Sequence, residues 1–171
     1  MTSGMRTALA DSRSTTRNPL DLLQEIVEAH EWAFERSGRD ELVIEVGGRW
    51  ADYRLYFAWE DAVSALQFAC QVDMKVPSAS KLGFYELLGL VNERLWLGHF
   101  DLDSDERAPT FRHTQLLRGA QGASVEQLED LIDVALTECE KYYPAFQFSI
   151  WGGKSGPEAI AAAILETVAE A

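Results

Sequence analysis

The chain has 171 residues, with 28 acidic against 15 basic side chains and a formal net charge of −13. This length suits one domain with a hydrophobic core. Nucleic-acid binders need Lys and Arg to neutralise phosphates, so the acidic balance argues against nucleic acid, and against an anionic membrane surface for the same reason. Two explanations of the charge remain open: it keeps the protein in solution, or it attracts a basic partner.

Residues 1–17 are rich in Ser, Thr, Ala and Arg. They contain no apolar stretch long enough for a signal peptide, and no later segment approaches the length of a membrane span. We therefore predict a disordered N-terminal tail over 1–17, a single domain over 18–171 and a cytoplasmic location. The two cysteines, Cys70 and Cys139, fall on apolar phases, which predicts buried free thiols.

A first helix is predicted from Asn18, which can cap it, to Gly38, because apolar residues recur at helical spacing as far as Phe34. The period then changes to two. Gly47-Gly48 predicts a two-residue hairpin loop between the first two strands. The alternation predicts three strands in this part of the chain, over 41–46, 50–59 and 66–76.

A second helix is predicted from Ser78 or Ser80 to Gly98. Gly83 and Gly89 weaken this helix, which indicates close packing against another part of the structure. Two further strands are predicted after the helix, over 99–103 and 110–118.

Ser124 and Gln127 form a capping box that opens a third helix. The run Tyr142-Tyr143-Pro144 either kinks this helix or begins another, and a last helix is predicted over 157–171. The order α-βββ-α-ββ-α-α predicts an α+β fold, with an antiparallel sheet of about five strands and helices packed on one side.

Several stretches of the chain resemble the YbjN family. They are 49–53 (RWADY), 57–59 (FAW), 66–68 (LQF), 92–101 (NERLWLGHFD), 117–122 (LRGAQG) and 142–147 (YYPAFQ). The resemblance runs from about Asn18 to the C-terminus. It implies a fold similar to the class I type III secretion chaperones, which typically dimerise, although the extra C-terminal helix departs from that pattern. The family is described as bacterial sensory transduction regulators, and the resemblance implies no enzymatic activity, cofactor or catalytic residue.

The residues themselves indicate little catalytic chemistry. The run 152–155 (GGKS) lacks the earlier glycine of a phosphate-binding loop, because Phe148 occupies that position, so a helix terminator is the better interpretation. His99, Asp101 and Asp103 alternate on one strand face, and His113 could lie across from them. These residues either form a metal site or belong to an ordinary strand edge. Because zinc requires three or four ligands held in a fixed geometry, we predict no metal.

Aromatic side chains outside the buried phase are candidates for a protein interface. On the strand 50–59, Trp50, Arg54 and Tyr56 are predicted to share the outer face, and Trp96 lies off the apolar stripe of its helix. Either these rings anchor a partner, or they are ordinary surface rings. We predict a non-enzymatic regulator or adaptor that binds another protein of unknown identity and forms a homodimer. The alternative is a small-molecule-sensing domain with an aromatic-lined pocket.

Overall fold

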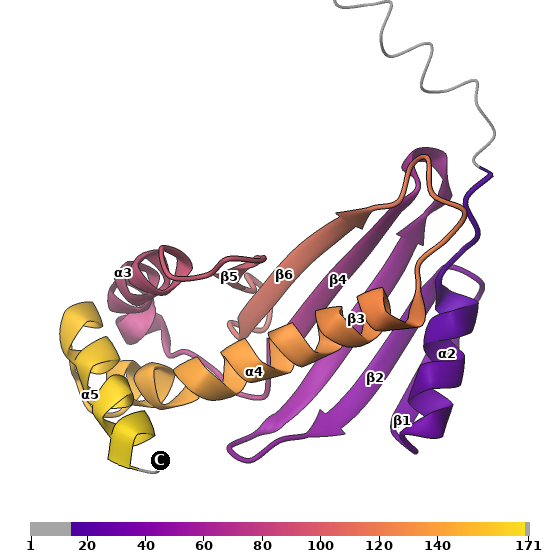
Figure 1. The fold of residues 1–171 in the computed structure, drawn as a ribbon. Coiled ribbons are helices and arrows are strands. Elements are labelled where there is room, and N and C mark those ends of the chain that lie inside the picture. The colour runs from indigo at the N-terminus through magenta and orange to yellow at the C-terminus, as the bar shows by residue number, and fades with distance from the viewer. Residues whose placement is uncertain (1–14, 170–171) are drawn as a thin grey trace, which may run out of the picture.

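The computed structural model describes residues 15–169, which form an antiparallel six-stranded sheet with helices on one face and at one end (Figure 1). The strand order is β1-β2-β3-β4-β6-β5. The strands are β1 (Ala33–Ser37), β2 (Glu41–Gly47), β3 (Asp52–Glu60), β4 (Ala65–Val72), β5 (His99–Leu102) and β6 (Pro109–Leu116). The predicted α+β class and antiparallel sheet are confirmed, with six strands in place of about five.

The additional strand comes from the end of the predicted first helix. Helix α2 (Leu20–Ala29) begins where the Asn18 Oδ1 atom accepts a hydrogen bond from the Leu20 backbone N–H at 2.9 Å. It ends far short of Gly38, because Glu31 adopts a left-handed conformation with φ of 58° and turns the chain. Strand β1 then pairs Phe34 with Ile44 of β2. The helical prediction for 30–38 is therefore wrong, since pairing with β2 outweighs the local apolar spacing.

The first hairpin is present, but its loop is longer than predicted. Gly47 pairs with Asp52, so residues 48–51 form a four-residue loop closed by the Gly48 N–H to Ala51 C=O hydrogen bond of 2.9 Å. The two-residue prediction is wrong, and strand β3 begins two residues later than expected. This shift decides the place of Trp50.

Helix α4 (Val125–Ile150) crosses the buried face of the sheet (Figure 1). The predicted capping box is confirmed, because Ser124 Oγ accepts from Gln127 N while Gln127 Oε1 accepts from Ser124 N. Pro144 lies inside the helix, which continues through it without beginning another.

The core lies between α4 and the sheet. Aromatic rings join the elements near Pro144, since Phe146 packs 5.4 Å from Phe100 of β5 and 5.3 Å from Phe84, measured between centroids. Phe100 also packs edge-on against Phe111 of β6. These four rings are buried and hold the C-terminal half of α4 on the edge of the sheet.

Helices α3 (Lys81–Asn92) and α5 (Gly156–Ala169) gather beyond one end of the sheet (Figure 1). A short 3₁₀ helix, η2 (Ser78–Ser80), precedes α3, and another, η1 (Asp61–Val63), joins β3 to β4. A Cβ atom added at Gly83 or Gly89 would meet nothing within 4 Å. The prediction of close packing at these glycines is wrong within the described chain, because both face away from the core.

The last residues of the predicted tail are placed. Thr16 is buried, and its hydroxyl donates to the Leu117 and Ala120 carbonyls at 3.3 and 2.8 Å. The Arg17 N–H donates to the Gln121 carbonyl at 2.8 Å. The tail prediction is therefore wrong for 15–17, and the rest of it, 1–14, lies outside the described residues. Among residues 15–169, no helix combines the length and apolar composition that crossing a bilayer requires.

Candidate protein-binding surface

Within residues 15–169, helices cover one face of the sheet and none covers the other (Figure 1). The alternation along each strand buries one set of side chains under α2 and α4 and turns the other set outward. Across the outward set, the register aligns five residues from five neighbouring strands in one row: Val43, Tyr56, Ala69, Arg112 and His99. We call the surface around this row the open sheet face.

The middle of the open sheet face is hollow and apolar. Its centre is formed by the half-buried side chains of Val43, Tyr56, Ala58 and Ala69. The hollow has a volume of about 670 Å³ and draws its lining from β2, β3, β4 and β6, with Gly98 and His99 at one side. Because neighbouring strands lie about 4.8 Å apart, a row of five strands is roughly 19 Å wide. The surface is therefore broad enough for a polypeptide segment.

The basic side chains of this face are held in ion pairs. Arg112 Nε lies 2.8 Å from Asp101 Oδ2, and its Nη2 lies 3.6 Å from Asp103 Oδ1. Arg54 Nη2 lies 3.1 Å from Glu45 Oε1. The nearby Tyr56 hydroxyl, and after it the Glu45 carboxylate, raise the pKa of the Arg54 guanidinium, which stays charged.

The acidic side chains along β1 and β2 are placed differently. Glu35 is opposite Val43 and Glu41 is opposite Ala58, so both border the apolar centre. Both are exposed, and within residues 15–169 neither carboxylate has an ion-pair partner. The edge of the open sheet face near β1 is therefore negatively charged.

The predicted interface residues divide into two groups. Arg54 and Tyr56 lie on the open sheet face as predicted, on the opposite side of β3 from the buried Leu55. Trp96 is in the turn after α3, not in a helix, and is 76% exposed.

Trp50 lies elsewhere. It is in the loop before β3, where its ring stacks on Tyr143 of α4 with centroids 6.2 Å apart and planes 9° apart, and the Arg49 guanidinium lies 4.8 Å from the Trp50 ring. The placement of Trp50 on the outer sheet face is therefore wrong, because the four-residue loop moves it out of the strand and toward the helix side.

The candidate metal ligands are not brought together. His99 and Asp101 share a face, with His99 Nε2 3.9 Å from Asp101 Oδ2, but the same oxygen accepts from Arg112. His113 pairs with the buried Phe68 and so projects from the opposite face of the sheet. The grouping of His113 with the other candidates is therefore wrong. Among residues 15–169, no three His, Cys, Asp or Glu side chains are placed to hold a metal ion.

Sequence reasoning missed Arg112. Its position on the predicted strand 110–118 was available, but a strand pattern does not give the register between two strands. The register sets Arg112 opposite His99 and next to Asp101, so a cation lies where the sequence suggested metal ligands.

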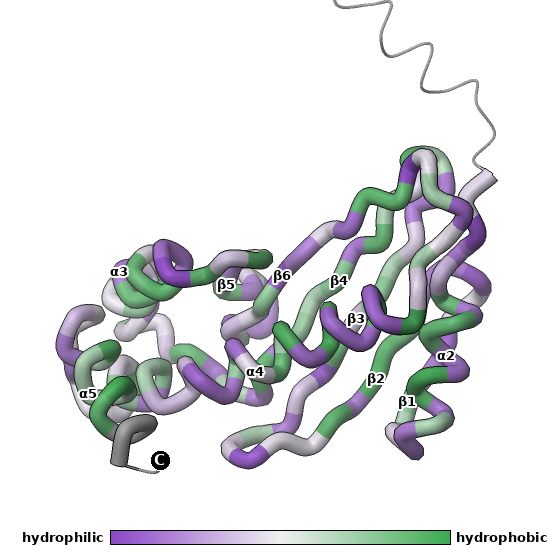
Figure 2. Tube along the Cα trace, in the orientation of Figure 1, coloured by the Kyte–Doolittle hydropathy of each residue, from purple (hydrophilic) through white to green (hydrophobic). Residues whose placement is uncertain are grey.

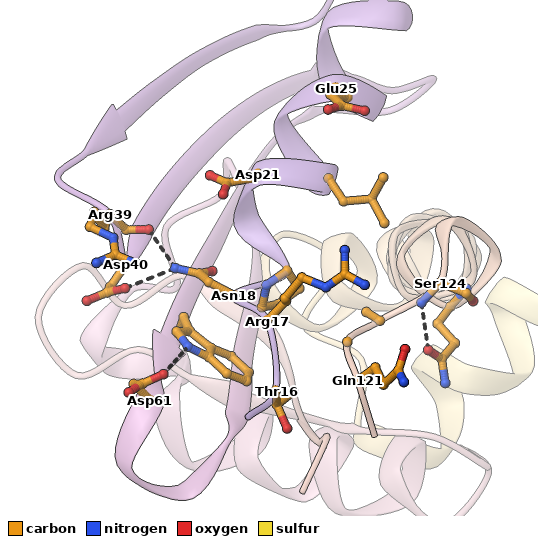
Figure 3. Close-up of a pocket in the computed structure, with 16 residues that line it drawn as sticks. Thr16, Arg17, Asn18, Asp21, Glu25, Arg39, Asp40, Asp61, Gln121 and Ser124 are labelled. Carbon is orange, nitrogen blue, oxygen red and sulfur yellow. Dashed lines mark hydrogen bonds between the residues drawn. The ribbon is translucent and has the colours of Figure 1, made fainter. Parts of the chain in front are cut away.

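A second, more polar hollow of about 940 Å³ lies where α2 and α4 begin (Figure 3). Its walls are joined by hydrogen bonds: Asn18 Nδ2 donates to the Arg39 carbonyl and to Asp40 Oδ1 at 3.0 Å each, and Trp59 Nε1 donates to Asp61 Oδ1 at 3.3 Å. The Asn18 bonds tie the N-terminal segment to the turn before β2, and the Trp59 bond lies within the connection from β3 to β4. These contacts of the hollow are structural.

The GGKS run lies in the turn between α4 and α5. The Lys154 N–H donates to the Phe148 carbonyl at 3.2 Å, and Gly153 has a φ of 62°. Ser155 and Glu158 exchange hydrogen bonds that cap α5. The interpretation as a helix terminator is confirmed.

The comparison with family models agrees with the resemblance seen in the sequence. A family model described as "YbjN: Putative bacterial sensory transduction regulator" matches residues 19–148. A similar solved structure is that of YbjN from E. coli, titled a "putative transcription regulator", with 17% identity and a TM-score of 0.47 over 77% of this chain and 97% of that one. The search of curated proteins gave no match. With three quarters of its length matched by the family model, the chain belongs to the YbjN family.

Proposed function

We propose that this YbjN-family chain is a non-enzymatic regulator that binds another protein across the open sheet face. The observation that carries the proposal is the apolar hollow around Tyr56, on a sheet face that no helix of the described part of the chain covers (Figure 1). Exposed apolar patches rimmed by polar groups mark association sites, and aromatic side chains are their usual energetic anchors. The family description as a regulator of sensory transduction supports the same kind of role.

The charges favour a partner with basic residues. The carboxylates of Glu35 and Glu41 border the hollow, whereas the guanidinium groups of Arg54 and Arg112 are engaged by acids of the same chain. The whole chain carries a formal charge of −13, which speeds encounter with a basic partner through long-range attraction. We therefore expect an apolar contact at Tyr56 flanked by Lys or Arg of the partner near β1.

A catalytic role is not part of the proposal. His99 and Arg112 line one side of the hollow, and Arg112 is paired with Asp101 and Asp103. We propose that these ion pairs hold β5 and β6 together at the edge of the binding surface.

The test uses a photo-crosslinking amino acid at position 56 in the native cell, with position 85 as the matched control. Tyr85 is an exposed tyrosine on α3, away from the open sheet face. A protein captured at 56 and not at 85 is then purified, and its affinity for the purified chain is measured. Tyr56→Ala should weaken binding by about 2 kcal/mol, roughly thirtyfold in Kd, while Tyr85→Ala leaves the Kd unchanged.

The electrostatic half of the proposal is tested with the same partner. Glu35→Gln and Glu41→Gln together should slow association and reduce its dependence on salt. Equal affinities for wild type, Tyr56→Ala and Tyr85→Ala would contradict the proposed surface.

The volume of the hollow also favours a second candidate function, the sensing of a small molecule. About 670 Å³ lies within the range of ligand pockets, and Tyr56 and Val43 supply an apolar wall. A thermal-shift screen tests this, because a ligand that binds only the folded state raises Tm, and Tyr56→Ala should abolish the shift. A metabolite library that leaves Tm unchanged would exclude this candidate.

A further inference from the structure

A small cavity of about 250 Å³ lies between helices α2 and α4, on the side of the sheet opposite the open sheet face. It is lined by two residues at the end of α2, one before β1 and three of α4: Ile26, His30, Trp32, Glu129, Ile132 and Asp133. Among residues 15–169, no lysine or arginine lines it. Pockets for whole small molecules are larger, about 300–1,000 Å³, so this cavity suits a single long side chain.

The aromatic wall of the cavity is held in a fixed orientation. The His30 ring stacks on the Trp32 ring, with centroids 4.4 Å apart and planes 28° apart. The His30 Nδ1 atom lies 2.9 Å from the Ile26 carbonyl oxygen, and the Trp32 backbone N–H donates to the Val27 carbonyl at 3.2 Å. Trp32 is half-buried and borders the cavity. Its indole is therefore placed before any ligand arrives.

The wall formed by α4 carries two negative charges. Glu129 and Asp133 are four residues apart, which sets their side chains on one face of the helix, where like charges repel and destabilise it. Within residues 15–169, neither carboxylate has an ion-pair partner. Figure 2 shows hydrophilic and hydrophobic residues following one another along the start of α4. A cation in the cavity would relieve the repulsion.

The remaining lining is apolar. Ile26 and Ile132 are 6% and 2% exposed. A long cationic side chain matches this arrangement, because its methylene stem packs on apolar groups while its charged end stays beside the acids. A planar guanidinium also stacks on aromatic rings and pairs with carboxylates through parallel N–H groups, which an ammonium does not. The chemistry of the cavity therefore favours arginine over lysine.

We propose that this cavity binds an arginine side chain of a partner protein, with the guanidinium against the Trp32 indole and paired with Glu129 and Asp133. The assignment rests on the proposed function only for the expectation of a protein partner, since the cavity is on the other side of the sheet from Tyr56. Glu35 lies on the open side of β1, the edge strand that follows Trp32. A basic segment that reaches around this edge would meet acids on both sides.

The test is an NMR titration of the full chain, labelled with ¹⁵N, with Nα-acetyl-arginine methylamide at low and constant ionic strength. The indole N–H signal of Trp32 is identified by its loss in Trp32→Phe. This signal should shift saturably, with a Kd on the order of 10 mM for one isolated side chain. The signal of Trp96, which is 76% exposed elsewhere, should not. Nα-acetyl-citrulline methylamide, a neutral analogue of similar shape, should leave the Trp32 signal unshifted.

Two double variants test the carboxylates. Glu129→Gln with Asp133→Asn should weaken arginine binding by about fivefold or more. Glu126→Gln with Asp130→Asn is the matched control, because these exposed acids have the same spacing on α4 but do not line the cavity, and it should leave the Kd unchanged.

An unshifted Trp32 signal, an equal shift with the citrulline analogue, or equal weakening by the two double variants would overturn the proposal. These measurements need no partner protein. Failure of the cavity assignment and failure of Tyr56→Ala to weaken partner binding are therefore separate results.

Discussion

The Cys139 thiol of α4 lies 3.8 Å from the Cys70 thiol of β4, and neither side chain has exposed surface. The two sulfur atoms join the middle of the long helix to the centre of the sheet. Burial, and after it the neighbouring Cys70, raise the pKa of the Cys139 thiol. Since the thiolate is the reactive form of cysteine, burial protects both thiols, and the raised pKa adds to the protection of Cys139.

Both cysteines should therefore react with Ellman's reagent only when the protein unfolds. At mildly alkaline pH the native chain should show no fast-reacting thiol, and two should appear in denaturant, as the two free cysteines require. A thiol that reacts at the rate of a small-molecule thiol in the native state would contradict the buried placement. The variant Ser104→Cys places a thiol in an exposed loop and provides the positive control, because this thiol should react in the native state.

Tyr53 should make the fold sensitive to alkaline pH. Burial, and after it the negative charge of Glu140, raise the pKa of Tyr53, which is 1% exposed. Because the pKa of Tyr53 is raised in the folded state, the contribution of its neutral phenol to the free energy of unfolding is complete below about pH 10, the usual tyrosine value. That contribution is lost as pH rises beyond this value. Urea unfolding at a series of pH values should show the free energy of unfolding falling above about pH 10.

The matched variant is Tyr53→Phe. The Tyr53 hydroxyl has no hydrogen-bond partner among the described residues, so its removal should change the free energy of unfolding at neutral pH by no more than about 1 kcal/mol. The same variant should lose less of its free energy of unfolding above about pH 10 than the wild type does. Burial also raises the pKa of Tyr143, so part of the loss should remain. An unchanged pH dependence in Tyr53→Phe would exclude Tyr53 as its source.

Two glycine-to-alanine changes should alter the stability of the fold in opposite directions. A Cβ atom at Gly48 would overlap the Glu140 carboxylate and the Tyr53 ring, and would lie 3.0 Å from the Ala51 carbonyl oxygen. Gly48→Ala should therefore destabilise by about 1–3 kcal/mol, as overpacking does. Gly89→Ala, in α3 with nothing within 4 Å, should stabilise by about 0.5–1 kcal/mol. Thermal denaturation of both variants measures the contrast, and equal shifts in Tm would contradict it.

Removal of the cap of α4 should weaken the fold measurably. Ser124→Ala deletes the hydroxyl that accepts from Gln127 N, which should cost about 1 kcal/mol. Ser104→Ala, in an exposed loop, is the control and should change the free energy of unfolding by less than about 0.5 kcal/mol. Chemical denaturation distinguishes the two, and a cap variant as stable as the control would show that the capping box contributes nothing.

Local patterns in the sequence predicted much of the fold. The strict alternation along β3 identified Arg54 and Tyr56 as outward-facing, because a strand turns successive side chains to opposite faces. The capping box at Ser124 likewise depends on residues three positions apart. Each of these features is decided by neighbours in the chain, so each could be predicted without a structure.

The failures share a different cause. Phe34 fits a helical stripe, yet it lies in β1 because Ile44 of the neighbouring strand offers a pairing partner. Trp50 fits the alternation of β3, yet the loop before the strand turns its ring toward Tyr143 of α4. In both cases a distant partner competes with the local pattern, and local spacing carries no information about that partner.

By itself, the sequence determined the α+β class, the acidic charge, the membership of the YbjN family and the outward phase of Tyr56. Only the tertiary structure decided that Val43, Tyr56, Ala69 and Arg112 share one row, and that Arg112 neutralises the acids beside it. The physical reason is that period and composition are properties of one segment, whereas register, ion pairing and the walls of a cavity depend on how separate segments are set against one another in space.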